Sequence, residues 1–230
     1  KSLAVLPATA KGTALIEVIL KATNAPVSAT SGACDVARAW RLSKLSKELD
    51  ALAQNGSSNV VASAVLAVTE LSGTAEEALY RNALEKTTRF GWPAGFTLLT
   101  DDLLKRKPDW AAKVLTEQLS REDSVTLALG SLAKLGDESA PVREAVRRVA
   151  ESKMPWTARN QAIVTLCALH DPSAAWFEAM YTNRNLSVEA RGSCLLALAR
   201  NAPEKARPLL LPAITNGFAS SPTEFGIFRF

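Results

Sequence analysis

The sequence predicts an all-α fold, an α-solenoid of about five to six antiparallel helical hairpins. Three observations predict it. Similar apolar strings recur along residues 124–216, at intervals of 34 and 31 residues. A proline follows each string after a short loop, and successive prolines are 31 residues apart. A second amphipathic stretch begins at each proline, a residue that suits the first turn of a helix because its missing N–H needs no partner there.

The apolar strings align at their loop ends. They read LGSLAKLGD at 129–137, IVTLCALHD at 163–171 and CLLALARNA at 194–202, and the prolines that follow are Pro141, Pro172 and Pro203. The same period extends backwards to FTLLTDDLLK at 96–105, followed by Pro108, and to AVLAVTELSG at 64–73, followed by Thr74. Since neither helix of such a pair can bury its apolar stripe alone, we expect each hairpin to stack on the next.

Two loop strings, LGDE at 135–138 and LHDP at 169–172, resemble the short HEAT-like repeats named after phycobilisome lyases. The resemblance covers about residues 57–216 and implies a right-handed solenoid, but it is a signature of fold and leaves the activity open. We expect one continuous domain with three regions. These are N-terminal helices that cap the array (1–56), the HEAT-like repeats (57–216) and an aromatic C-terminal tail (217–230).

The region before the repeats is expected to hold two helices. Residues 11–22 predict a helix whose apolar face includes Leu15 and Val18, and the small residues at 26–33 predict a linker. Apolar residues then recur at helical spacing from 34 to 53, which predicts one long helix. Its opposite side is basic, which is more typical of a solvated face than of a phosphate site; the cations are Arg38, Arg41, Lys44 and Lys47.

The first well-registered pair is predicted at residues 59–71 and 74–88. Ser72, Gly73 and Thr74 supply the turn and the cap between the two helices. The stretch at 89–96 then breaks the rhythm with two glycines, a proline and three aromatic residues. We expect its aromatic side chains, which include Phe90 and Trp92, to fill a gap between hairpins; a binding loop is the alternative.

Five residues of the second helices are candidate binding groups. Trp110 and Trp176 hold corresponding places near helix starts, Arg143 and Arg147 lie four apart on one face, and Arg207 continues the cationic excess. Tryptophans at equivalent positions usually pack between repeats, but on an open face they form a platform for peptides or bases. Glutamates are interleaved with these cations, so a phosphate track is expected only if the acids lie on the opposite surface.

Few groups suit catalysis. No nucleotide-binding, HExxH or GxSxG motif is present, and the carboxylate pairs at 76–77 and 101–102 are adjacent, so their side chains diverge by about 100° on a helix. His170 occupies the loop position of Gly136 in the preceding repeat, which favours a helix-end residue over a catalytic base. The three cysteines, Cys34, Cys167 and Cys194, are far apart and predict buried core residues. We expect no catalytic residue, metal or cofactor.

These observations favour a non-enzymatic scaffold that binds a protein partner on the concave face lined by the second helices. Two alternatives stay open: a nucleic-acid-binding solenoid or HEAT-like DNA glycosylase, and a chromophore lyase or chaperone-like subunit suggested by the resemblance. The net charge of +4, from 27 cations and 23 anions, does not demand a polyanionic partner. No apolar run reaches the ~20 residues of a transmembrane helix. Because the chain begins with Lys1, we expect an excised or processed piece of a longer protein, which leaves its compartment open.

Overall fold

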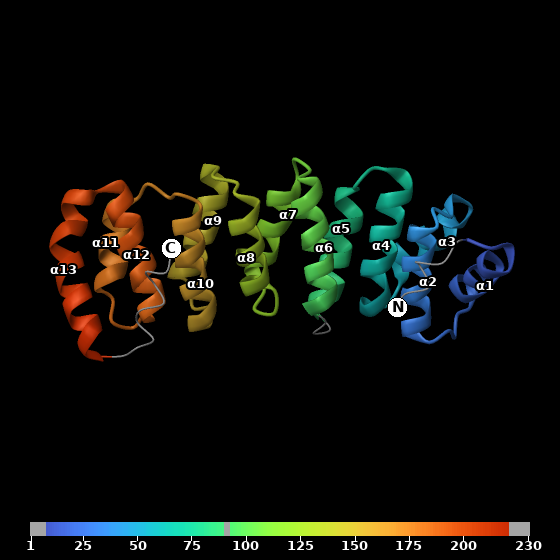
Figure 1. The fold of residues 1–230 in the computed structure, drawn as a ribbon, viewed down its shortest axis with the longest axis horizontal. Helices are drawn as coiled ribbons and strands as arrows, with labels where there is room; N and C mark the ends of the chain where they lie inside the picture. Colours follow the sequence, from blue (N-terminus) through green and yellow to red (C-terminus); the bar gives the residue numbers. More distant parts are fainter. Residues whose placement is uncertain (1–7, 90–92, 221–230) are drawn as a thin grey trace. The chain divides into compact units, whose positions relative to one another are not determined.

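The computed structural model describes residues 8–89 and 93–220 of the 230-residue chain. These residues form an all-α structure of thirteen α-helices (Figure 1). The chain divides into two compact units, Lys1–Val114 and Leu115–Phe230, and each is described by itself. The predictions for Phe90, Trp92 and the end of the aromatic tail lie outside the described residues.

Unit 1 is organised around one buried helix. Its helices are α1 (Ala10–Lys21), α2 (Val27–Ala39), α3 (Ser46–Asn55), α4 (Ser58–Ser72), α5 (Glu77–Arg89) and α6 (Pro93–Arg106), and α7 (Ala111–Glu117) begins in it. α4 packs against α2, α3, α5 and α6. Every residue from 60 to 69 of α4 is buried. A helix that is buried on all sides needs small and apolar residues all round, and the sequence of α4 supplies them.

Unit 2 has the same style of packing. Its helices are α8 (Val125–Leu135), α9 (Ala140–Glu151), α10 (Trp156–Ala168), α11 (Ala174–Thr182), α12 (Val188–Asn201) and α13 (Pro203–Ser220). α10 packs against α8, α9 and α12, and α12 packs against α10, α11 and α13. The closely packed partners in each unit are therefore helices one or two places apart in the chain. We call α2, α4, α6, α8, α10 and α12 the first helices, and α3, α5, α7, α9, α11 and α13 the second helices.

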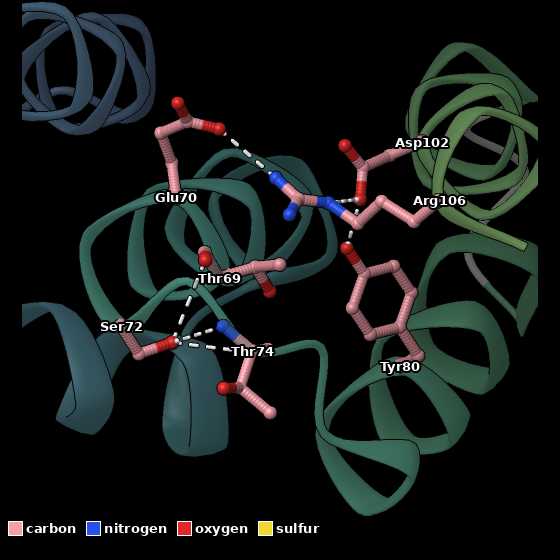
Figure 2. A network of polar contacts seen from close by, with 7 residues as sticks. All are labelled: Thr69, Glu70, Ser72, Thr74, Tyr80, Asp102 and Arg106. Carbon is pink, nitrogen blue, oxygen red and sulfur yellow. Dashed lines mark hydrogen bonds and ion pairs between the residues drawn. The ribbon is translucent and has the colours of Figure 1, made fainter. Parts of the chain in front are cut away.

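Several helices end in a similar backbone conformation. Five residues that follow successive first helices have positive φ angles between 47° and 74°, at intervals of 29 to 34 residues; they are Arg41, Gly73, Lys107, Gly136 and His170. A left-handed residue after a helix lets its N–H close the last turn, as Gly73 N does on Thr69 O at 3.0 Å and Gly136 N on Leu132 O at 3.1 Å. The Ser72 hydroxyl accepts from Thr74 N beside Gly73, as predicted for this turn (Figure 2).

Within each unit, side-chain hydrogen bonds join helices that are two places apart in the chain. In unit 1 they link α2 to α4, α3 to α5 and α4 to α6, through Ser31 and Ser63, Lys86 and the Gln54 carbonyl, and Arg106 and Glu70. In unit 2 they link α8 to α10, α10 to α12 and α11 to α13, through Thr165 and the Leu129 carbonyl, Arg200 and the Cys167 carbonyl, and Lys205 and Glu178. Within each unit, these bonds join residues that are 27 to 36 positions apart in the chain.

The N-terminal region differs from the prediction in two ways. The supposed linker at 26–33 is helical from Val27 onwards, and the long helix expected over 34–53 is broken by a turn at Trp40 to Leu42, where α2 ends and a short 3-10 helix leads into α3. The Ser31 and Ser63 hydroxyls lie 2.8 Å apart. Small residues let α2 approach α4 closely, and this tertiary contact compensates for their weak helix propensity.

The buried face of α1 was also predicted wrongly. Leu15 and Val18 are 57% and 64% exposed, whereas Ile16 and Leu20 are buried. Gly12 lies on the same side as Ile16 and Leu20, and the Trp40 ring rests against it so closely that a Cβ there would come within 2.9 Å. This contact at Gly12 sets the rotation of the helix.

Candidate functional site

Two of the predicted arginines reach the loop that joins α10 to α11. Arg143 and Arg147 both project from α9, four residues apart as the sequence indicated. Arg143 Nη1 donates to the His170 carbonyl at 3.0 Å. Arg147 Nη2 donates to Asp171 Oδ2 at 2.6 Å and to Ser173 Oγ at 2.7 Å. One second helix therefore binds the loop of the next repeat through two guanidinium groups.

Asp171 is the centre of this loop site. Its side chain is 1% exposed, and a buried carboxylate needs several partners to offset the loss of water. Besides Arg147, it accepts from Ser173 N through Oδ1 at 2.9 Å, and its carbonyl accepts from Asn201 Nδ2 at 2.6 Å. Hydrogen-bond donors from α9, from the residue before α11 and from α12 thus all bind Asp171. The arrangement neutralises the charge and joins three elements, which leaves Asp171 poorly suited to acid–base work.

Trp176 is held beside the same arginine. Its indole Nε1 donates to Glu151 Oε1 at 2.6 Å, and the Arg147 guanidinium lies 5.7 Å from the ring centroid. The ring also meets Phe177 edge to face at 5.2 Å between centroids. Trp176 is half-buried and fixed on two sides, so it packs between α9 and α11 while part of the residue remains open to solvent.

His170 has the backbone conformation that the alignment with Gly136 predicted. Its φ is 49° and that of Gly136 is 70°, and both residues follow a first helix. The exposed His170 ring places Nδ1 2.6 Å from Glu138 Oε1. The residue therefore closes a helix end, and its ring bridges two successive loops.

Trp110 belongs to unit 1 and lies just before α7, not inside a helix opened by Pro108 as the sequence suggested. Its ring packs against Tyr80, with centroids 5.6 Å apart and an angle of 53° between the planes. Tyr80 in turn begins the polar network of Figure 2. Its hydroxyl donates to Asp102 Oδ2, which also accepts from Arg106 Nε at 2.8 Å, and Arg106 Nη2 donates to Glu70 Oε2 at 2.9 Å.

The surroundings of these groups favour their uncharged or paired forms. Burial, followed by the hydrogen bond to Asp102, raises the pKa of the Tyr80 phenol above its ordinary range. Burial also raises the pKa of the Cys34 and Cys194 thiols to about 12, and raises that of Cys167. All three thiols are free and buried, as predicted. Because a thiolate is the reactive form, these cysteines are poor nucleophiles at neutral pH.

The structure thus brings together three of the five candidate residues, Arg143, Arg147 and Trp176. Trp110 lies in the other unit, and Arg207 is exposed on α13 without a hydrogen bond to the other candidates. The sequence interpretation missed Asp171, although its match to Asp137 in the alignment was a usable signal. The link from Tyr80 to Asp102 had no signal in the sequence, because it depends on how α5 and α6 pack.

No family model, curated protein or solved structure matches the chain. The HEAT-like resemblance therefore remains a prediction from the sequence pattern. Over the residues that the structure describes, no three His, Cys, Asp or Glu side chains gather as metal ligands would. Within the same residues, no helix combines the length and apolar character that crossing a membrane requires.

Proposed function

We propose that the hairpins stack as a HEAT-like solenoid and that the protein is a non-enzymatic scaffold, which binds a protein partner on a concave face lined by the second helices. The helix-end conformations recur every 29 to 34 residues, and hydrogen bonds join equivalent helices within each unit, which supports a repeat array. Arrays of this kind offer extended surfaces for binding.

The observation that carries the proposal is the mixture of charges on the second helices. Their cations contact carboxylates of the same surface: Arg148 Nε lies 3.8 Å from Glu144, Lys113 Nζ 3.0 Å from Glu77 and Lys205 Nζ 2.7 Å from Glu178. A phosphate backbone laid along these helices would meet the carboxylates as well. Tryptophan and arginine are residue types enriched at protein interfaces, and the interleaved acids disfavour a polyphosphate partner.

The chemistry of the buried clusters supports a non-enzymatic role. Asp102 is paired with Arg106, and Tyr80 is kept protonated, so the network in Figure 2 is suited to holding α4, α5 and α6 together. Asp171 is likewise engaged by Arg147 and the loop backbone. The side chains of Asp102, Tyr80 and Asp171 are all engaged in contacts within the fold, and we therefore assign them a structural role.

Site-specific photo-cross-linking tests the proposal. A photoreactive residue replaces Arg148, which is 71% exposed on the second helix α9, or Lys134, which is exposed near the end of the first helix α8. We expect a discrete protein adduct from position 148 in native extract, suppressed by excess unmodified protein. The matched position 134 should give little of it. Equal adducts from both positions, or an adduct removed by nuclease, would contradict a protein-binding face on the second helices.

A further inference from the structure

One edge of unit 2 carries four cations that the fold does not pair. They are Lys153 in the α9–α10 turn, Arg159 in the first turns of α10, Arg184 in the α11–α12 turn and Arg191 in the first turns of α12. Within the described part of the chain, none of the four forms an ion pair or a side-chain hydrogen bond. We call this set the basic edge.

The packing of α10 and α12 places the two central arginines side by side. Near their C-terminal ends the two helices are joined twice: Arg200 of α12 donates to the Cys167 carbonyl at 3.2 Å, and Asn201 donates to the Asp171 carbonyl, just past α10, at 2.6 Å. Since α10 and α12 also pack against one another, we place their starts at the same edge of the unit. Eight and nine residues back, Arg159 and Arg191 occupy corresponding places, on axes separated by roughly 8–10 Å.

Arg159 and Arg191 lie on the inward sides of their helices. The Nε atom of each is fully buried and has no hydrogen-bond partner. A buried N–H without a partner is costly and rare in native structures. Cations near the start of a helix are also disfavoured by its dipole. Arg147 Nε also lacks a partner, but the guanidinium of Arg147 is paired with Asp171 through Nη2. Among the described residues no carboxylate pairs with Arg159 or Arg191, so both guanidinium groups are available to one from outside.

An exposed aromatic side chain lies on the same helix face as Arg159. Trp156 opens α10, three residues before Arg159, and it is 62% exposed. Tryptophan and arginine are the residue types that most often anchor a protein interface. The basic edge thus combines an apolar platform with guanidinium groups that can each hold a carboxylate in a bidentate geometry.

We propose that the basic edge binds a short acidic segment of the protein partner, with carboxylates on Arg159 and Arg191 and an apolar side chain on Trp156. The inference rests on the scaffold function and adds the chemistry of the partner. A long polyanion fits this edge less well, because the α7–α8 turn at the start of α8 carries two acids, Glu122 and Asp123, and its one cation, Arg121, is paired with Asp123. Positive charge is therefore local, and it matches a few carboxylates better than a continuous phosphate backbone.

Fluorescence anisotropy with a labelled peptide, rich in glutamate and containing a single leucine, tests this inference. We expect saturable binding to the intact chain that is lost when lysine replaces glutamate in the peptide. Arg159→Gln and Arg191→Gln should each weaken binding about tenfold, and Trp156→Ala about fivefold. The matched control is Lys134→Gln, which removes an exposed charge at the opposite end of a first helix in the same unit and should leave binding unchanged.

The thermal unfolding midpoints of the same variants distinguish a loss of peptide binding from a loss of folding stability. The two arginine variants should keep or raise the midpoint, because an unpaired cation is removed from a helix start. A fall in the midpoint that parallels the loss of binding would overturn the proposal, as would no binding of the acidic peptide. Tighter binding of duplex DNA or tripolyphosphate would assign the edge to phosphates instead. If the peptide fails while position 148 still cross-links to a protein, only this inference fails and the scaffold function stands.

Discussion

Asp171 shows how one loop carboxylate can hold neighbouring repeats together. It shares its loop position with Asp137, and each accepts from a backbone N–H two residues on at 2.9 Å. Only Asp171 also receives an arginine of the preceding second helix and is almost fully buried. The two aspartates therefore separate the contribution of the local turn from that of the contact between repeats.

We predict that Asp171→Ala lowers the free energy of unfolding by about 2–3 kcal/mol, because it removes a turn cap and leaves Arg147 without its anion. The matched change Asp137→Ala removes only the cap and should cost about 0.5–1 kcal/mol. Chemical denaturation of both variants measures the difference. Similar losses would show that the Arg147–Asp171 pair adds no net stability.

Tyr80 gives unit 1 a dependence on alkaline pH. Its pKa is raised in the folded state, so its stabilising effect is complete below the unfolded value of about 10 and is lost as the pH rises beyond it. We predict that Tyr80→Phe costs about 1 kcal/mol near neutral pH and that the variant then loses stability less steeply above pH ~10. Denaturation curves at a series of alkaline pH values provide the test. Parallel losses in both proteins would exclude Tyr80 as the cause.

Five of the first helices are each followed by a residue in the left-handed conformation. Two glycines, one inside α8 and one at its C-terminal cap, allow the effect of this conformation on stability to be measured separately. Gly130 lies inside the helix and Gly136 has φ +70°, and a Cβ added at either position would meet nothing within 4 Å. Only the backbone conformation distinguishes the two sites.

We predict opposite results for the two alanine substitutions. Gly130→Ala should raise the free energy of unfolding by up to about 1 kcal/mol, because alanine favours the helix. Gly136→Ala should lower it by about 1 kcal/mol, because an L-residue is strained in the left-handed region. Thermal or chemical denaturation measures both. A stabilising Gly136→Ala would mean that the loop does not hold this conformation in solution.

The sequence predicted elements well where periodicity and turn residues agreed. The pair at 59–71 and 74–88 closely matches α4 and α5, and the alignment of His170 with Gly136 anticipated their shared conformation. The wrong predictions concern segments whose structure depends on contacts with another part of the chain. Residues 26–33 lack an apolar period strong enough to signal a helix, yet packing on α4 makes them one. Likewise, the contact of Trp40 with Gly12 decides which face of α1 is buried.

At the scale of the whole molecule, the sequence predicted that helices close together in the chain would pack against one another. It predicted the hydrogen bonds between their side chains only in part. Arginines at 143 and 147 were expected to share a face, and they do, but their partners Asp171 and His170 lie 24 and 27 residues away. Separations near one repeat follow from the period once the hairpins are stacked. Which side chains bond at that separation depends on lengths and rotamers that a single sequence does not display.

We propose that the second helices offer a surface of mixed charge that binds a protein and not a polyphosphate. Titration of the intact chain against labelled duplex DNA at low and at physiological salt tests it most directly, with Arg148→Gln as the variant on α9. We predict weak binding that does not change with Arg148→Gln, since Glu144 already faces that cation. Tight binding at low salt that weakens steeply as salt rises, and that Arg148→Gln reduces, would contradict the account.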